Sequence, residues 1–407
     1  MKFSFEVPAS FLISGEYFVT LDGGLGLAMA ARPTVRVSIR RRHNSSKEII
    51  CLTRMGFHQH ERHNLADKQL FSPLLQAVRE TWEREIGSLS KVSYAAEIIL
   101  DSSQFFAQDG RKLGFGSSAA VCAGLCTALA HIHPAGMRLT RLRLAQVAIT
   151  AHRRFQGGRG SGYDVMTAIM GGAGIFRGGR RPDWTALPGL RDSLSRRAEA
   201  NWIINAPEAV STPSSISGFS AFRSAKPELC QQLFERSQAL HADIRPDSFT
   251  RISPEFLQAA AQIGIEIGEA IEVPAAVPAQ VLERLRLARV AARAGGTRRG
   301  NLPGAASAAS GSRRGSLPGP AAWSTAAAAQ GGLTAGVAAA AGATGPRQGS
   351  PAAASMAGAA GLQLPLKASG AGAETILAIG LQKRPHPAAM RVRPWLKGVP
   401  LPMERTI

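Results

Sequence analysis

Two glycines and two serines stand directly before a run of small apolar residues in KLGFGSSAAVCAGLCTALAHI, residues 112–132. Gly114 and Gly116 permit a tight turn with positive φ and close approach of a ligand to the backbone. Ser117 and Ser118 follow where a helix is expected to begin, and a helix N-terminus presents unpaired N–H groups and a partial positive charge. The stretch predicts a phosphate site with a serine hydroxyl available to Mg²⁺, and a capped structural helix is the alternative.

A second glycine-rich stretch, HRRFQGGRGSGYDVMTAIMGG, covers residues 152–172. Asp164 follows its glycine turn and precedes an apolar run, so the carboxylate either caps a helix or stands at a phosphate site, where it orients or deprotonates an acceptor. Three arginines in this stretch suit phosphate contacts or a solvated surface. A third loop of this kind, Lys367-Ala-Ser-Gly-Ala-Gly-Ala-Glu374, lies near the end of the chain.

The elements that must position these loops follow from periodicity. Alternating apolar residues predict early strands at residues 3–7, 11–13 and 34–41 and later ones at 94–100 and 202–206, and helical spacing predicts helices at 70–85, 139–152, 228–240 and 254–271. This order indicates an α+β domain and not a regular β-α-β series, with a domain boundary near residue 195.

The basic composition is uneven along the chain. The net charge is +20, but residues 284–407 hold sixteen Lys/Arg and two acidic residues, against 32 and 26 in the first 283 residues. A nucleic-acid-binding face would be more evenly basic, so no nucleic-acid partner is expected, although a tail that binds nucleic acid or an anionic surface remains the alternative. The four cysteines have no zinc-like spacing and are expected to be buried thiols.

The segment from Glu272 to Thr375 contains no Ile, Phe or Tyr and is dominated by Ala, Gly, Ser, Pro and Arg. Such a composition offers few side chains that offset the entropy of ordering, so most of residues 291–360 are expected to be poorly ordered. The segment is either a natural insert or the product of a shifted reading frame. No signal peptide is expected, because Glu6 and Glu16 interrupt the first apolar stretch. The long uncharged run Leu113–Ile132 has too much Gly and Ser for a good membrane span, so the sequence predicts a cytoplasmic protein.

Three segments in order resemble the hallmarks of the GHMP kinase superfamily: VPASFLISGEYFVTLDGGLGLAMAA, KLGFGSSAAV and LKASGAGAETILAIG. Within the superfamily, H-x-x-x-Q-G-G-x-G-S-G-x-D-V is most similar to phosphomevalonate kinases. The resemblance implies a GHMP kinase fold of the α+β class. A domain similar to ribosomal protein S5 domain 2 would span residues 1–195, and a ferredoxin-like domain 196–380, interrupted by the low-complexity segment 281–361. A basic tail would follow at 381–407.

The resemblance also implies a role for each matching residue. Asp164 and Lys112 would be catalytic, and Ser118 would bind Mg²⁺. The ATP phosphates would be held by a set in the first loop: Gly114, Gly116, Ser117, Ser118 and Ala119. The acceptor site would be shaped by residues of three segments: Glu16, Gly160, Ser161, Gly162, Gly370 and Gly372, with Ala371 between the last two.

The implied activity is ATP-dependent phosphorylation of a small acceptor, 5-phosphomevalonate to 5-diphosphomevalonate, in the mevalonate route to isoprenoids. Mevalonate kinase, another GHMP kinase and a catalytically inactive relative are the alternatives. One departure concerns the opening motif, which normally carries a lysine where this chain has Ser10. Lys112 is the candidate to supply that charge. A second departure is His152 with Arg153, where mevalonate kinases place a Mg²⁺-binding glutamate.

Overall fold

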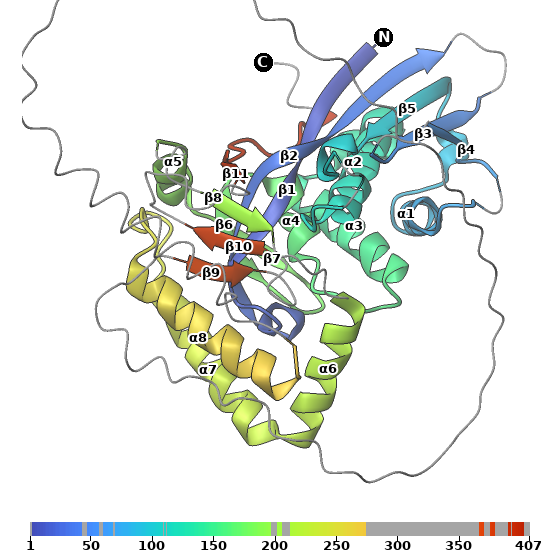
Figure 1. Cartoon of the computed structure of the whole chain (residues 1–407). Helices are drawn as coiled ribbons and strands as arrows, with labels where there is room; N and C mark the ends of the chain where they lie inside the picture. Colours follow the sequence, from blue (N-terminus) through green and yellow to red (C-terminus); the bar gives the residue numbers. More distant parts are fainter. Residues whose placement is uncertain are drawn as a thin grey trace, which may run out of the picture. The chain divides into compact units, whose positions relative to one another are not determined.

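Figure 1 shows a computed structural model of the chain. The described residues are 2–42, 47–56, 60–67, 70–108, 110, 112–196, 202–205, 212–273, 366–369, 375–378, 390–391 and 393–402. Residues 291–360, most of which are expected from their composition to be poorly ordered, and the loop Gly370–Glu374 lie outside them. The division into domains at residues 195 and 380 stays a prediction.

A seven-stranded, mostly antiparallel sheet forms the first part of the fold, in the order β4-β3-β5-β2-β6-β7, with β1 pairing β2. The long strand β2 pairs β1 over most of its length, β6 near its start and β5 near its end. Only β3 and β5 run parallel. The strands are β1 (Lys2–Ser14), β2 (Leu25–Arg42), β3 (Ile49–Arg54), β4 (Glu61–Asn64), β5 (Ala95–Asp101), β6 (Ala173–Arg177) and β7 (Asp183–Ala186).

The prediction of two early strands, at residues 3–7 and 11–13, is wrong in one respect: they form a single strand, β1. Pro8 suggested a break, because proline cannot donate a ladder hydrogen bond. Among the described strands, β1 pairs with β2 alone, and the register shifts between Pro8 and Ala9, so a bulge accommodates the proline at a sheet edge. The continuous strand carries Ser10 directly toward the glycine loop described below.

Helices pack against this sheet and against one another. Gly124 of α2 lies so close to the sheet that a Cβ there would be 2.9 Å from the Val37 side chain, which explains the small residues of this helix. The predicted helices at 70–85 and 139–152 are confirmed with slightly shifted ends. The helices are α1 (Pro73–Glu85), α2 (Ser117–Ile132), α3 (Arg141–Phe155), α4 (Tyr163–Met170) and α5 (Pro188–Arg196).

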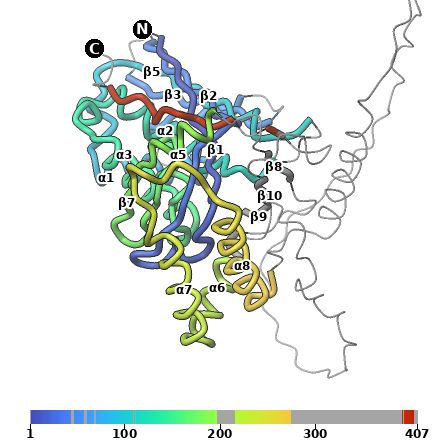
Figure 2. The backbone as a smooth tube through the Cα atoms, turned by 90° about the vertical axis from the view of Figure 1, so that its left-hand side faces the viewer, coloured from blue at the N-terminus to red at the C-terminus, as the bar shows by residue number. Residues whose placement is uncertain are grey.

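A smaller antiparallel sheet, in the order β11-β8-β10-β9, and three helices form the second part of the fold. α7 and α8 lie side by side (Figures 1 and 2), and the predicted strand at 202–206 and helices at 228–240 and 254–271 are confirmed. The elements are β8 (Trp202–Asn205), α6 (Thr212–Ala225), α7 (Pro227–Ala242), α8 (Pro254–Ala270), β9 (Leu366–Ser369), β10 (Thr375–Ala378) and β11 (Met390–Arg391).

The turn after β1 joins the two parts through a buried polar contact and an aromatic cluster. Ser14 at the end of β1 lies 2.8 Å from Nε2 of His241 on α7, and both are buried. Nδ1 of His241 donates to the Ser237 carbonyl at 2.6 Å, so Nε2 accepts from the Ser14 hydroxyl. Phe18 of the same turn packs against Phe219, with ring centroids 5.7 Å apart.

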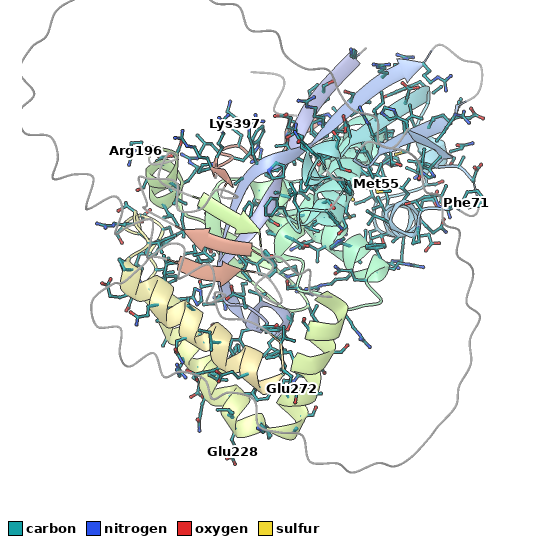
Figure 3. All side chains as sticks on the ribbon, in the orientation of Figure 1. Met55, Phe71, Arg196, Glu228, Glu272 and Lys397 are labelled. Atoms are coloured by element: carbon teal, nitrogen blue, oxygen red, sulfur yellow. The ribbon has the colours of Figure 1, made fainter. Side chains whose placement is uncertain are left out.

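Residues 393–402, which belong to the sequence predicted as a basic tail, pack on the first part of the fold. The Trp395 N–H donates to the Ala30 carbonyl and the Gly172 N–H to the Trp395 carbonyl, at 2.8 and 2.7 Å. The Val399 N–H donates to the Ile169 carbonyl at 2.9 Å. This C-terminal segment, in which Lys397 is labelled in Figure 3, therefore covers the end of α4 and the middle of β2.

The four cysteines are free and buried, as predicted. Within the described ranges, no helix is both long and apolar enough to span a bilayer.

Candidate active site

The first turn of α2 has no side-chain cap. Gly116 precedes the helix with a φ of 72°, in the left-handed region that glycine tolerates best, and Gly114 has a φ of 73°. Gly116 has no side chain that could cap the N–H groups of Ser117, Ser118 and Ala119. A helix start of this kind is the geometry expected of a phosphate site, and phosphate binding here stays a prediction.

Asp164 stands in the first turn of a second short helix, α4, which also starts after a glycine with positive φ, Gly162 at 79°. A Cβ at Gly162 would lie 2.5 Å from the Ile149 side chain, so only glycine fits there. Oδ1 of Asp164 accepts from the Val165 N–H at 2.9 Å, and its side chain is 20% exposed. The carboxylate therefore caps its own helix with one oxygen and leaves the other for the site.

His152 at the end of α3 links the two helix starts. Its Nε2 lies 3.1 Å from Oγ of Ser118, and its Nδ1 lies 3.9 Å from Oδ2 of Asp164. Burial is the main cause of a lowered pKa of His152, which keeps the ring neutral near neutral pH. The nearby carboxylate favours the proton on Nδ1, so Nε2 accepts the Ser118 hydroxyl hydrogen. That bond turns the lone pairs of the Ser118 oxygen away from the ring.

Ser10 of β1 also lies beside Gly116. A Cβ at Gly116 would be 3.3 Å from Oγ of Ser10 and 3.9 Å from Cβ of Asp164. Strand β1 thus places the Ser10 hydroxyl beside Gly116, which is also near Asp164. The superfamily motif has a lysine at the position of Ser10. The exposed Lys112 is close enough for its charge to lower the pKa of His152, so a positive charge does stand beside this group.

The structure thus places Asp164 and Lys112, the pair predicted to be catalytic, both near His152, which also contacts Ser118. Glu16 is buried in the turn beyond β1, where it has contacts of its own, and its role at the site stays a prediction. Gly370 and Gly372 fall outside the described residues; in the sequence they follow β9 and precede β10. Sequence reasoning missed the bridging position of His152, because a single histidine at a helix end carries no spacing signal.

The three arginines near the second glycine turn have different partners. Arg153 donates to the carbonyls of Gly160, Ser161 and Gly179. Arg154 pairs with Glu80 of α1, and Arg159 donates to Oγ of Ser217 on α6 at 2.6 Å. Arg153 is therefore used to hold backbone and is not free to bind phosphate.

The donor set suits Mg²⁺ held together with a nucleotide. Within the part of the chain that the structure describes, no three His, Cys, Asp or Glu side chains are grouped to hold a metal ion. Mg²⁺ prefers oxygen ligands and is usually bound by one or two protein groups and the phosphates of its nucleotide. Oγ of Ser118 and Oδ2 of Asp164, on either side of the His152 ring, are such oxygens.

Exchange of Gly116 for alanine is expected to weaken nucleotide binding about tenfold. A left-handed backbone costs an L-residue about 1–2 kcal/mol, and the new methyl group would crowd Ser10 within the loop. Titration calorimetry with a non-hydrolysable ATP analogue measures the effect. Gly110→Ala is the matched control, because Gly110 has a φ of 82° but no atom within 4 Å of an added Cβ. Equal losses in both variants would contradict a specific role for Gly116.

Comparison with known proteins agrees with this geometry. Residues 75–172 match the family described as GHMP kinases N terminal domain. The matched residues begin within α1 and extend just beyond the end of α4. A phosphomevalonate kinase of Saccharolobus solfataricus is 29% identical over 167 residues. The match covers 41% of this chain and 46% of that protein, so the chain spans less than half the length of this relative.

Solved structures show the same fold at low identity. The Lin0012 protein from Listeria innocua aligns with a TM-score of 0.54 at 16% identity, over 70% of this chain and 83% of the other. The phosphomevalonate kinase of Streptococcus pneumoniae, in complex with phosphomevalonate and AMPPNP, aligns with a TM-score of 0.51 at 12% identity, over 70% and 84%. Mevalonate kinase of Methanococcus jannaschii gives 0.50 at 16% identity over the same shares. The α+β fold predicted from the sequence is confirmed.

Proposed function

We infer that this chain, of which residues 75–172 match the GHMP kinases N terminal domain, is a GHMP kinase that transfers the terminal phosphoryl group of ATP to a small acceptor. The observation that carries the proposal is the meeting of two glycine-preceded helix starts at one histidine. The start of α2 offers N–H groups to an anion, and the start of α4 offers a carboxylate, with His152 between them. Phosphoryl transfer needs this combination of positioning and charge stabilisation.

We propose 5-phosphomevalonate as the acceptor and its diphosphate as the product. The named relative in Saccharolobus solfataricus and the stretch HRRFQGGRGSGYDV support this choice over mevalonate. An oxygen of the acceptor phosphate would form the new bond to the γ-phosphorus, while the bond from that phosphorus to the bridging oxygen of ADP breaks. The second pKa of a phosphate monoester is about 6, so the attacking oxygen is already ionised near pH 7.

Because no proton must leave such an acceptor, Asp164 would act mainly by holding Mg²⁺ and orienting the substrate. Bound Mg²⁺ would neutralise charge on the phosphates. The backbone N–H groups of Ser117, Ser118 and Ala119 would hold the ATP phosphates, and Lys112 would supply the positive charge that Ser10 lacks. Gly160, Ser161 and Gly162 would shape the acceptor side of the site.

A coupled assay of ADP release with phosphomevalonate, mevalonate and galactose tests the proposal. Turnover with phosphomevalonate at least tenfold above the other two acceptors is expected. Turnover with mevalonate alone would overturn the substrate assignment and leave the kinase assignment intact.

An inactive relative is the second candidate, favoured by one observation: a neutral hydroxyl, Ser10, lies beside Gly116 where the superfamily motif has an ammonium group. Calorimetry separates the two candidates. Binding of ATP without turnover on any acceptor would identify an inactive relative, whereas turnover would show that Ser10 is compatible with catalysis.

A further inference from the structure

Arg153 is placed as a clamp on the second glycine turn. Its Nε donates to the Gly160 carbonyl at 3.0 Å, one terminal nitrogen donates to the Ser161 carbonyl at 2.6 Å, and the other donates to the Gly179 carbonyl at 3.0 Å. All three guanidinium nitrogens are thus used on backbone.

The segment that Arg153 holds consists mainly of glycine. Gly157, Gly158, Gly160 and Gly162 all have positive φ angles, and a Cβ at Gly157 or Gly158 would meet nothing within 4 Å. Four glycines in six residues leave a turn with high conformational entropy, which needs external contacts to hold one shape. The turn leads directly into α4, so its shape determines where Asp164 stands.

The positive charge of Arg153 also favours a fixed position of Asp164. Burial lowers the pKa of Arg153, and the charge of Asp164 opposes that shift, so the two side chains attract one another. A lysine would keep the charge but lose the fork, because one ammonium group cannot reach three carbonyls that lie in different directions.

We propose that Arg153 is a positioning residue that fixes the glycine turn Gly157–Gly162 and thereby the carboxylate of Asp164. This inference rests on the proposed kinase activity for its kinetic consequence, but not for its structural one. The preceding residue, His152, contacts Ser118 at the first glycine loop. The last turn of α3 therefore contacts both glycine loops.

The test compares Arg153→Ala, Arg153→Lys and the control Arg154→Ala, whose side chain pairs with Glu80 on α1. Arg153→Ala should lower kcat about tenfold or more, while its affinity for a non-hydrolysable ATP analogue changes less than about twofold, because Arg153 does not touch the α2 loop. Guanidinium ion added to Arg153→Ala should restore part of kcat, and Arg153→Lys should stay impaired. Arg154→Ala should behave as the unmodified protein.

Hydrogen exchange separates failure of this inference from failure of the proposed function. Faster amide exchange at residues 160–164 in Arg153→Ala, reversed by guanidinium ion, supports the clamp even if no acceptor is turned over. Unchanged exchange in that turn overturns the clamp. So does a folded Arg153→Ala protein with full kcat, or an equal loss of kcat and nucleotide affinity that guanidinium does not reverse.

Discussion

Replacing Asp164 by asparagine is expected to lower kcat by about 10²–10³-fold. The amide keeps the size of the side chain, and its oxygen can still accept from the Val165 N–H, so α4 stays capped. It loses the negative charge that faces Nδ1 of His152 and that would hold Mg²⁺ at the phosphates. Affinity for the nucleotide analogue without Mg²⁺ should stay within about threefold, because the N–H groups of α2 are untouched.

Asp183→Asn is the matched control for this variant. Oδ1 of Asp183 accepts from the Trp184 N–H at 2.8 Å, which is the same local hydrogen bond, but Asp183 lies at the start of β7. The control should keep the kcat of the unmodified protein. Steady-state kinetics at saturating ATP and Mg²⁺ measure both variants. An Asp164→Asn enzyme within about threefold of the unmodified kcat would show that this carboxylate has no part in the reaction.

The second large effect concerns stability in mild acid. Burial lowers the pKa of His241 from 6.5 to about 4. The unfolded chain binds this proton as the pH falls through about 6.5, whereas the folded protein resists it until about pH 4, so stability present above pH 6.5 is lost progressively between these values. Between about pH 7.5 and pH 5 this single group should lower the free energy of unfolding by about 2 kcal/mol.

Urea unfolding at the two pH values measures this loss. His241→Gln is less stable at pH 7.5, because the hydrogen bond from Ser14 is altered, but the change in its unfolding free energy between the two pH values should be about 2 kcal/mol smaller. Part of the pH dependence remains in that variant, since burial also lowers the pKa of His152. An equal pH dependence in both proteins would show that His241 is accessible to protons in the folded state.

The sequence was sufficient to predict the parts of the site that depend on local chemistry. Gly116 and Gly162 mark helix starts, because a left-handed glycine before an apolar run is a local signal, and both Ser118 and Asp164 stand in the helical turns predicted for them. Their meeting at one point could not be deduced from spacing. It depends on Ser10 in β1 and His152 in α3, which approach these helices only through the tertiary fold.

Arg153 illustrates why partners were harder to predict than elements. Arginine beside a glycine turn suggests a phosphate ligand, but the fold offers it three carbonyls instead, and backbone acceptors have no sequence signature. The same holds for residues 393–402, whose composition is that of a loop. Their hydrogen bonds to Ala30, Ile169 and Gly172 are made by main-chain groups, so no pattern of side chains in the sequence predicts them.

Because of the contacts of residues 393–402, the fold of the first part can be completed only after this segment has been synthesised. The backbone groups of Ala30, Ile169 and Gly172 are translated before their partners Trp395 and Val399, which follow only after residues 173–392. A nascent chain that stalls before Arg393 therefore has these groups uncovered, however well its remaining helices have formed. Such stalled chains should be bound by chaperones for longer than chains that extend past Val399 and have left the ribosome. The α4 helix that carries Asp164 should become resistant to protease only once residues 393–402 have emerged.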